Sequence, residues 1–447
     1  MHPLKVYTRW RPLTEQETPL STTTIPHNPN YSITLSNTNP NPNTNPKPWK
    51  SDPTYAQIFA PTSTNQDIYE TVVLPTLPDI LKGNTSNILA YGHSGTGKTH
   101  TIFGYDFAHS PELGICLSTA KDLLDTLHAL NHSSSDPLSK KREDKLGLGV
   151  RMYELRQKTA FDLLNSRRPC HVREGYDGRT HIRGETEVLD EGKVRVRPVV
   201  AKACWGFEEV LETVRCGLGR RATGSSGVHD LSSRTHAVVE LEIVSWSLLQ
   251  AREGVVERES ELVPVAKAAT DVYLREHMRA LVLGEGGEYV VDPGVRVDLG
   301  KIEEAEGRKR VFEGYVKEAE ERVRRVFEGG FEGLGGRVVF VDLAGSEYFD
   351  RSVRVRQTPQ EVREGRQINS DLLALKEVIR ARALKMARIP FRASPLTMVL
   401  REHFVPAERE SYSAMILTVS SAAEQVDATL NTLKYGNLVG VAGKGGR

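Results

Sequence analysis

Residues 87–99 read NILAYGHSGTGKT, and this stretch decides the fold. Its first five residues form a short apolar run bounded by turn-forming residues, which predicts a buried parallel strand. The eight residues that follow fit G-x-x-x-x-G-K-[ST], the pattern of a phosphate-binding loop between a strand and a helix. Glycines let backbone N–H groups close around phosphates, and the next helix adds the positive end of its dipole. The stretch predicts a nucleoside triphosphate site.

Two side chains of this loop have separate expected roles. Lys98 places a positive charge on the β- and γ-phosphates, and the Thr99 hydroxyl ligates Mg²⁺. We expect nucleotide contacts from the whole loop, which consists of Gly92, His93, Ser94, Gly95, Thr96, Gly97, Lys98 and Thr99. The motif does not say for what purpose the energy of the nucleotide is used.

A second motif, VVFVDLAGSE, occupies residues 338–347. A run of four apolar residues followed by an acid predicts a buried strand. The strand would place Asp342 near the metal ion, in the position of a Walker-B carboxylate. Gly345 leaves room for a backbone N–H to approach the γ-phosphate, so the segment is expected to sense that phosphate. The pattern of a strand followed by D-x-x-G also occurs in small GTPases.

A third motif, SSRTH, covers residues 232–236 and precedes another strand-like run. Two adjacent hydroxyls suit a metal ion and an attacking water, and Arg234 suits a carboxylate partner. Taken alone, the motif is more typical of a polar turn that caps a strand.

Further apolar runs alternate with helical patterns such as Phe207–Leu218, which predicts an α/β sheet with parallel strands. The other strand candidates are Leu4–Tyr7, Leu148–Leu155, Ala237–Val244 and Arg337–Leu343. A helix is expected over Gln66–Leu74, with Thr64 or Asn65 at its cap.

The bulk composition excludes several classes of protein. No run approaches the roughly 18 apolar residues of a membrane helix, and no signal-peptide pattern opens the chain. Four cysteines are too few for a disulfide framework and lack zinc-type spacing. The formal net charge is only +1, yet residues 351–401 hold twelve Lys or Arg and four Asp or Glu. This surplus of eight positive charges suits an acidic macromolecule, or else a solvated surface.

Two stretches differ from the rest in composition. Residues 37–48 are rich in Asn and Pro and predict a surface loop. Residues 247–336 are strongly charged and look inserted, with an amphipathic helix over Lys301–Glu328 that ends at Gly329 and Gly330. A solvated helix is the plain interpretation of this segment, and a partner-binding helix is the alternative.

The order of the three motifs resembles that of phosphate loop, switch I and switch II in kinesin motor domains. Residues 9–12 (RWRP) resemble the adenine-contacting R-x-R-P of that family, and residues 365–380 resemble its relay helix. Residues 390–401 resemble the loop and helix that sit on tubulin, and residues 429–435 resemble the closing helix. The resemblance covers roughly 1–246 and 337–440.

The resemblance implies a P-loop NTPase fold of the kinesin type, with a central, mostly parallel β-sheet flanked by helices on both faces. The motor domain would span 1–440, interrupted by the insertion 247–336 and followed by a short tail, 441–447. It implies ATP and Mg²⁺ as cofactors and a microtubule-stimulated ATPase of the cytoplasm and the microtubule cytoskeleton, the spindle included. Microtubules are the implied partner, without nucleic acid and without membrane insertion.

Single residues take roles from the same resemblance. Arg9, Pro12 and His100 would sandwich the adenine. Ser233 would complete the Mg²⁺ shell, with Asp342 acting through a water. The expected catalytic residues are Ser232, Gly345, Arg234 and Glu347. Ser232 would orient the lytic water. Arg234 and Glu347 would form an ion pair, and Glu347 would accept a proton through water. Microtubule contacts are expected from Arg351, Arg354, Arg356, Lys385, Arg388, Arg392 and Arg401.

The chain also departs from the family pattern. His229 replaces a usual Asn, Asp371 replaces a Ser or Thr, and Ala393 and Pro395 replace charged residues. None of these changes removes a phosphate-handling group. A degenerate module that binds microtubules with little hydrolysis stays open as an alternative. A GTPase or small-molecule kinase is disfavoured, because N-K-x-D and an acceptor site are missing.

Whether the domain walks along microtubules or disassembles them also stays open. Residues 161–165 (FDLLN) and 373–377 (LALKE) loosely resemble the internal-motor kinesins that depolymerise microtubule ends.

Overall fold

The structure is a computed structural model. It describes residues 4–36, 48–104, 113–132, 145–175, 178–221, 225–226, 229–230, 234–283, 288–346, 358–404 and 410–444. The expected surface loop 37–48 lies almost wholly outside these ranges.

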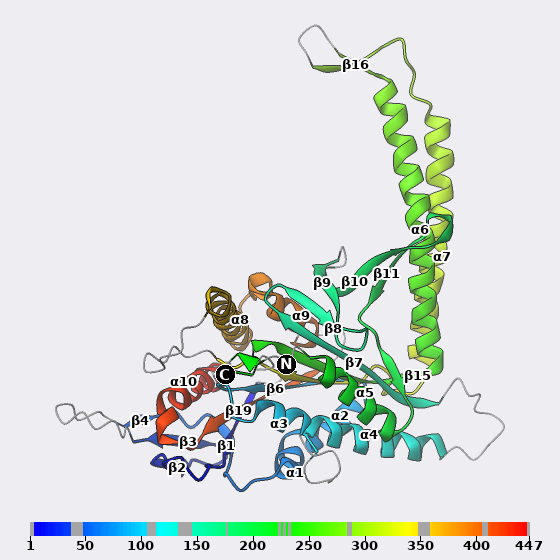
Figure 1. Ribbon diagram of the computed structural model, residues 1–447. Helices are drawn as coiled ribbons and strands as arrows, with labels where there is room; N and C mark the ends of the chain where they lie inside the picture. Colours follow the sequence, from blue (N-terminus) through cyan, green and yellow to red (C-terminus); the bar gives the residue numbers. More distant parts are fainter. Residues whose placement is uncertain are drawn as a thin grey trace.

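One large sheet forms the centre of the molecule, in the order β11-β10-β9-β8-β7-β15-β18-β6-β19-β1-β5-β3-β2, with β12 beside β7 and β4 beside β3 (Figure 1). Its strands are β1 (Lys5–Arg11), β2 (Thr22–Pro26), β3 (Tyr31–Leu35), β4 (Trp49–Lys50), β5 (Tyr55–Phe59), β6 (Thr85–Tyr91), β7 (Leu146–Arg156), β8 (Thr159–Asp162), β9 (Arg168–Glu174), β10 (Thr180–Val188), β11 (Val194–Pro198), β12 (Lys202–Cys204), β15 (His236–Ser245), β18 (Arg337–Asp342) and β19 (Ser411–Ser420).

The middle of this sheet is parallel. Strands β18, β6, β19, β1 and β5 run parallel to one another, whereas β15 pairs antiparallel with both β18 and β7. The predicted fold class is therefore confirmed, and every strand candidate from the sequence is a strand. The direction of β7 and β15 was not predicted, because an apolar run shows that a strand is buried and not which way its neighbour runs.

Helices cover both faces of the sheet. The α-helices are α1 (Asn65–Ile68), α2 (Leu77–Ile80), α3 (Lys98–Phe103), α4 (Ile115–His132), α5 (Phe207–Arg220), α6 (Trp246–Arg279), α7 (Leu299–Gly329), α8 (Pro359–Ala383), α9 (Pro395–Phe404) and α10 (Val426–Lys444). The predicted helix 66–74 consists of α1 and a π-helical turn, Tyr69–Val73, and Thr64 caps it with Asp67. α10 takes in residues 441–444 of the expected tail.

Alternating side chains of β18 separate two hydrophobic cores. Phe340 packs into the core with α3, α4 and α5, whereas Val339 packs into the core with α8, α9 and α10. All seven residues of β6 are buried between these layers. The end of β6, where the phosphate loop begins, is thereby held rigidly from both sides.

An arm, residues 246–329, projects from the body of the molecule (Figure 1). It consists of α6 and α7 side by side, joined at the tip by the two-stranded ribbon of β16 (Leu281–Leu283) and β17 (Tyr289–Val291). Ser245, the last residue of β15, caps α6 by accepting a hydrogen bond from the Leu248 N–H. The arm therefore continues the central sheet without a loop, and the helix predicted over 301–328 lies within α7.

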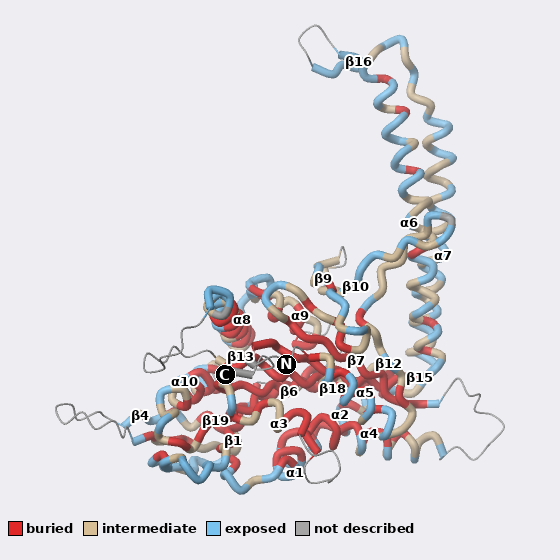
Figure 2. Tube along the Cα trace, viewed as in Figure 1, coloured by how far each residue is buried: buried red, intermediate tan, exposed pale blue. Residues whose placement is uncertain are grey.

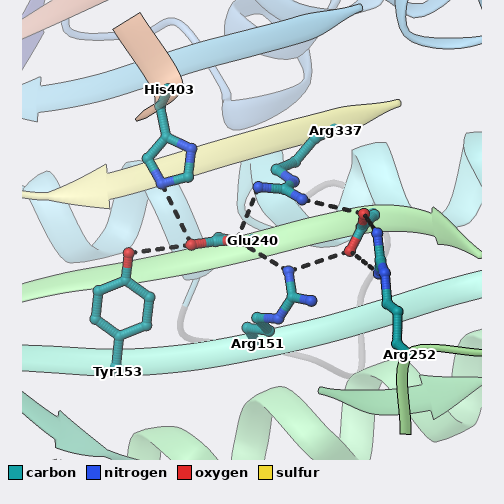
Figure 3. Close-up of polar contacts among 7 residues, drawn as sticks. Arg151, Tyr153, Glu240, Arg252, Arg337 and His403 are labelled. Carbon is teal, nitrogen blue, oxygen red and sulfur yellow. Dashed lines mark hydrogen bonds and ion pairs between the residues drawn. The ribbon is translucent and has the colours of Figure 1, made fainter. Parts of the chain in front are cut away.

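The root of the arm is fixed by a buried cluster of charges (Figure 3). Glu242 of β15 accepts hydrogen bonds from Arg252 of α6 at 2.8 and 3.1 Å, and from Arg337 at 3.0 Å. Glu240 contacts the Tyr153 hydroxyl at 3.0 Å and His403 of α9 at 3.3 Å. Burial alone would raise the pKa of Glu240, but His403 and the arginines more than offset it and lower that pKa. The cluster thus keeps two charged carboxylates inside the sheet.

Among the residues described, no helix is long and apolar enough to cross a membrane.

Candidate functional site

The phosphate loop has the backbone shape that its glycines permit. Gly95 and Gly97 adopt φ of 76° and 93°, in the left-handed region that glycine enters without strain. The Thr96 hydroxyl donates to the His93 carbonyl at 2.8 Å and so closes the loop. The buried Lys98 ammonium donates to the carbonyls of Gly92 and His93, at 3.1 and 2.9 Å. Its charge is thereby held over the loop, between β6 and α3.

Gly92 is needed for packing rather than for its φ angle. A Cβ at this position would lie 2.2 Å from the Thr418 carbonyl oxygen of β19. Burial and the Lys98 charge lower the pKa of the neighbouring His93 to about 4. Lys98 is therefore the positive charge of the loop at neutral pH.

The two expected metal-binding groups lie together. The Thr99 hydroxyl donates to Asp342 Oδ2 at 2.8 Å, and Arg221 Nη1 donates to the same oxygen at 2.6 Å. The other carboxylate oxygen, Asp342 Oδ1, is buried and has no hydrogen-bond partner in the described part of the chain. A hydroxyl beside a carboxylate with one free oxygen is the hard-oxygen donor set that Mg²⁺ prefers, so these residues fit the ion.

The segment after β18 touches the phosphate loop directly. The Ser346 N–H donates to the Gly92 carbonyl at 3.2 Å. A Cβ on Gly345 would lie 2.8 Å from the Ser94 backbone nitrogen, so this approach requires glycine. A change at Gly345 is therefore transmitted to the loop through backbone contact.

Arg9, predicted to face the adenine, is buried between two helices. Its Nη1 donates to Asn65 Oδ1 at 2.7 Å and to the Thr101 hydroxyl at 2.6 Å. Asn65 in turn donates to the His100 carbonyl at 3.1 Å. Arg9 and His100 are thus joined through Asn65, whereas Pro12 is exposed at the end of β1. Adenine contact stays a prediction for all three.

Three residues with expected roles in switch I and switch II, two of them catalytic and one a Mg²⁺ ligand, lie outside the described part of the chain. These are Ser232, Ser233 and Glu347. Arg234 is described and buried, and its Nη1 lies 4.0 Å from the Glu364 carboxylate of α8. Glu364 also accepts a hydrogen bond from Arg156 at 2.7 Å. The predicted pair of Arg234 with Glu347 stays a prediction.

Asp371, one of the departures from the family pattern, lies buried near His236. It accepts a hydrogen bond from Gln367 at 3.0 Å and lies 3.9 Å from His236 Nε2. Burial raises the pKa of Asp371 to about 6 and lowers the pKa of His236 to about 3. Since His236 Nδ1 accepts the Ala344 N–H at 3.0 Å, His236 connects α8 to the segment between Asp342 and Gly345.

The expected microtubule-binding residues divide into three groups. Arg351, Arg354 and Arg356 lie outside the described ranges, and Lys385 and Arg388 are exposed after α8. Arg392 and Arg401 both bind Glu174 of β9, at 2.7 and 3.2 Å. Hydrogen bonds from these two arginines lower the pKa of Glu174 to about 2. Arg382, counted in the basic stretch, is buried and donates to the Phe404 carbonyl, so it adds nothing to the surface.

Sequence reasoning missed four residues of the site: Asn65 as the partner of Arg9, Arg221, Arg156 and Glu364. Asn65, Arg221 and Glu364 each contact a motif residue from a distant part of the chain, and Arg156 contacts Glu364. No local pattern marks them. For Arg221 the only sequence signal is its place at the end of the predicted helix 207–218.

A family model described as the kinesin motor domain matches residues 9–268 and 311–440. Among similar curated proteins, Kinesin-like protein KIF24 of Homo sapiens is 26% identical over 392 residues, which are 88% of this chain and 20% of that protein. Kinesin-like protein KIN-13A of Oryza sativa subsp. japonica is 28% identical over 385 residues, 86% of this chain and 34% of that protein. The chain spans a fifth to a third of the length of these two relatives.

Two solved structures share the fold. One is KIF14 as a dimer in a two-heads-bound state with AMP-PNP and a microtubule, with a TM-score of 0.58 and 20% identity over 98% of this chain and 93% of that chain. The other is the motor domain of the Kar3-like kinesin from Ashbya gossypii, with a TM-score of 0.57 and 19% identity over 98% of this chain and 99% of that chain. The matched family residues include the phosphate loop, Arg234, Asp342 and Gly345, and the chain belongs to the kinesin motor domain family.

Proposed function

We propose that this chain hydrolyses ATP with Mg²⁺ and couples the hydrolysis to movement along microtubules or to their disassembly. The observation that carries the proposal is the contact between the two halves of the site. Asp342 and Thr99 share a hydrogen bond, and Gly345 and Ser346 lie against the phosphate loop. A third phosphate bound in the loop would meet the Gly345 backbone, so its loss on hydrolysis changes the position of that segment.

Residues of the chain have distinct parts in this proposal. Lys98 exchanges its loop carbonyls for phosphate oxygens, and the loop N–H groups hold the remaining negative charge. Thr99 and Ser233 would hold Mg²⁺, with Asp342 acting through a water, and the ion would neutralise charge at the phosphates. Ser232 orients the water, and Glu347, paired with Arg234, receives its proton. Arg9, Pro12 and His100 hold the adenine.

The route from this site to the filament runs through α8. Glu364 and Asp371 of α8 face Arg234 and His236, which flank the start of β15. The far end of α8 leads to the exposed Lys385 and Arg388, which we propose contact the acidic surface of tubulin together with Arg351, Arg354, Arg356, Arg392 and Arg401. A movement of α8 thus links the phosphate state to the basic face. The domain would work on the cytoplasmic microtubule cytoskeleton, including the spindle.

Steady-state ATP turnover with and without taxol-stabilised microtubules tests this function. We expect turnover well above the basal rate on microtubules, and its loss in Glu347→Ala. Microtubule co-sedimentation without any stimulation would instead favour the degenerate, nucleotide-gated tether.

Gly345→Ala gives a sharper version of the same test. Because its Cβ would lie 2.8 Å from the Ser94 nitrogen, the variant should keep ADP binding and lose most of the stimulated turnover. Gly314→Ala on α7 is the matched control, since a Cβ there meets nothing within 4 Å. Equal turnover in Gly345→Ala and wild type contradicts the proposed role of this contact.

A further inference from the structure

A groove with a volume of about 1070 Å³ runs along the arm, between α6 and α7. We call it the arm groove. Its lower end lies at Lys193, just before β11, and its upper end lies at Arg279 and Lys301. On α6 it extends from Arg258 to Arg279, which corresponds to about 30 Å of helix.

The floor of the arm groove is apolar and built from small side chains. Ala268, Ala269 and Ala305 contribute to it, together with Val272 and Phe312. Small residues let the backbone of another helix come close, as they do where helices pack tightly against one another. Figure 2 shows the arm as mostly exposed or half-buried, and α7 has no buried residue at all. A two-helix hairpin of this kind leaves room for a third helix along its seam.

The rim of the arm groove carries more positive than negative charge. Six basic and three acidic side chains line the groove. Three of the basic ones have acidic neighbours on their own helix, namely Arg258 with Glu261, Arg279 with Glu276, and Lys301 with Asp298. Within the described part of the chain, no carboxylate lies within 4.0 Å of Arg275 or Arg308. These two arginines, one on each helix, are free to bind acidic side chains.

We propose that the arm groove is a docking site for an acidic amphipathic helix of a partner protein. The apolar face of that helix packs on the alanine-rich floor, and its glutamates or aspartates bind Arg275 and Arg308. This is the helix-in-groove mode of recognition, which completes a three-helix bundle.

A second copy of the arm is a poorer occupant. α7 carries eight basic and eight acidic residues, so it has no net negative charge to complement the basic rim. The groove lies away from the phosphate loop, on an element outside both hydrophobic cores except at its root. The inference therefore does not depend on the proposed ATPase function.

The test uses the full chain and two designed, fluorescently labelled peptides. Each has about 21 residues, enough to span the groove, with Leu at heptad positions a and d and Ala at positions b, c and f. One peptide has Glu at e and g, and the other has Lys. In fluorescence anisotropy titrations we expect the Glu peptide to bind at least about tenfold more tightly, and its binding to weaken as salt is raised.

Variants of the arm separate the groove from the rest of the surface. Arg275→Glu with Arg308→Glu should weaken binding of the Glu peptide at least about tenfold, because like charges then face each other. Arg322→Glu with Arg325→Glu is the matched control on α7, since neither residue lines the groove. Ala305→Trp should fill the groove and abolish binding, while Val311→Trp, exposed on the same helix, should not. Circular dichroism and a thermal melt verify that each variant is folded.

Two results overturn the proposal. One is equal binding of the Lys and Glu peptides, or equal effects of the groove variants and their controls. The other is a dimer of the full chain in sedimentation velocity that Ala305→Trp dissociates, since a second copy would then fill the groove.

Discussion

Asp342 carries a buried carboxylate whose charge is balanced by Arg221 and whose Oδ2 also accepts the Thr99 hydroxyl. Arg221 lies at the end of α5, far along the chain from Asp342, and also donates to the Thr235 carbonyl at 3.1 Å. The Arg221 guanidinium thus joins the switch I and switch II segments, and Asp342 links it to Thr99 of the phosphate loop. Removing one member of a buried ion pair leaves an uncompensated charge, which costs more than the pair itself contributes.

Arg221→Met should lower the free energy of unfolding by about 3–5 kcal/mol, because the Asp342 carboxylate stays buried without a cation. Chemical denaturation of the nucleotide-free chain measures the change. The double variant Arg221→Met with Asp342→Asn removes both charges and should recover most of the loss. If the double variant is as unstable as the single one, packing rather than charge explains the effect.

Asp371 should make stability depend on pH. Its pKa rises from 3.8 in the unfolded chain to about 6 in the fold, so the fold favours the protonated acid. The contribution is complete below pH 3.8 and is lost as the pH rises through 6. Relative to Asp371→Asn, wild type should lose up to about 3 kcal/mol of stability between pH 4 and pH 7.5.

The comparison with Asp371→Asn isolates this titration, because His236 is present in both proteins. Urea denaturation at the two pH values gives the difference. Parallel pH profiles of the two proteins would show that the Asp371 carboxyl is not shifted by burial.

At the residue level, sequence reasoning found the groups that belong to contiguous motifs. Lys98 and Thr99 follow from the spacing of the phosphate loop, and Asp342 and Gly345 follow from a strand that ends in an acid. Arg221 and Glu364 could not be found in this way, because their partners are brought near only by the order of strands in the sheet. The structure places them by tertiary contact, which a local pattern does not encode.

At the scale of elements, β15 is the unusual strand. All ten of its residues are buried, although Glu240 and Glu242 interrupt its apolar run. The sequence predicted the strand over 237–244 from its remaining residues. The arginines that make the acids tolerable come from β7, α6 and β18, so their role became visible only in the fold.

Glu242→Leu should therefore destabilise the protein by about 3–5 kcal/mol, because Arg151, Arg252 and Arg337 lose a shared carboxylate inside the sheet. Denaturant unfolding measures the loss. Glu253→Leu is the matched control on α6. Glu253 is exposed and pairs with Arg197 at 3.2 Å, and its removal should cost less than about 1 kcal/mol. Equal losses in the two variants would contradict the buried charge balance.

At the scale of the whole molecule, we expect the body to fold without the outer part of the arm, residues 269–310. The kinesin family model leaves out residues 269–310, and none of the described residues among them belongs to either hydrophobic core. From the sequence, the charged stretch 247–336 is interpreted as an insertion, which stays a prediction, and a helix is predicted over 301–328. The sequence did not predict that α6 is as long as α7 and pairs with it, because helical periodicity does not identify the packing partner.

Replacing residues 269–310 by a short Gly/Ser linker should leave the body folded. The ends of the cut lie on helices that pack side by side, so closing the gap costs little entropy. We expect an unchanged thermal midpoint of the main transition and unchanged ADP affinity, measured by calorimetry and by fluorescent ADP titration. Loss of ADP binding in the shortened chain would show that the outer arm supports the nucleotide site.

The direct continuation of β15 into α6 has a mechanical consequence. β15 begins at His236, next to the switch, and Ser245 passes the chain into a helix of 34 residues, about 50 Å long. Arg252 ties the first turns of that helix to the sheet, so the joint is stiff. A tilt of the strand by only about 5° is therefore magnified to a displacement of about 4 Å at the far end. The arm thus amplifies movements of β15. A dye attached at its tip would report sub-ångström movements beside the nucleotide as displacements of several ångströms, which a distance measurement can detect.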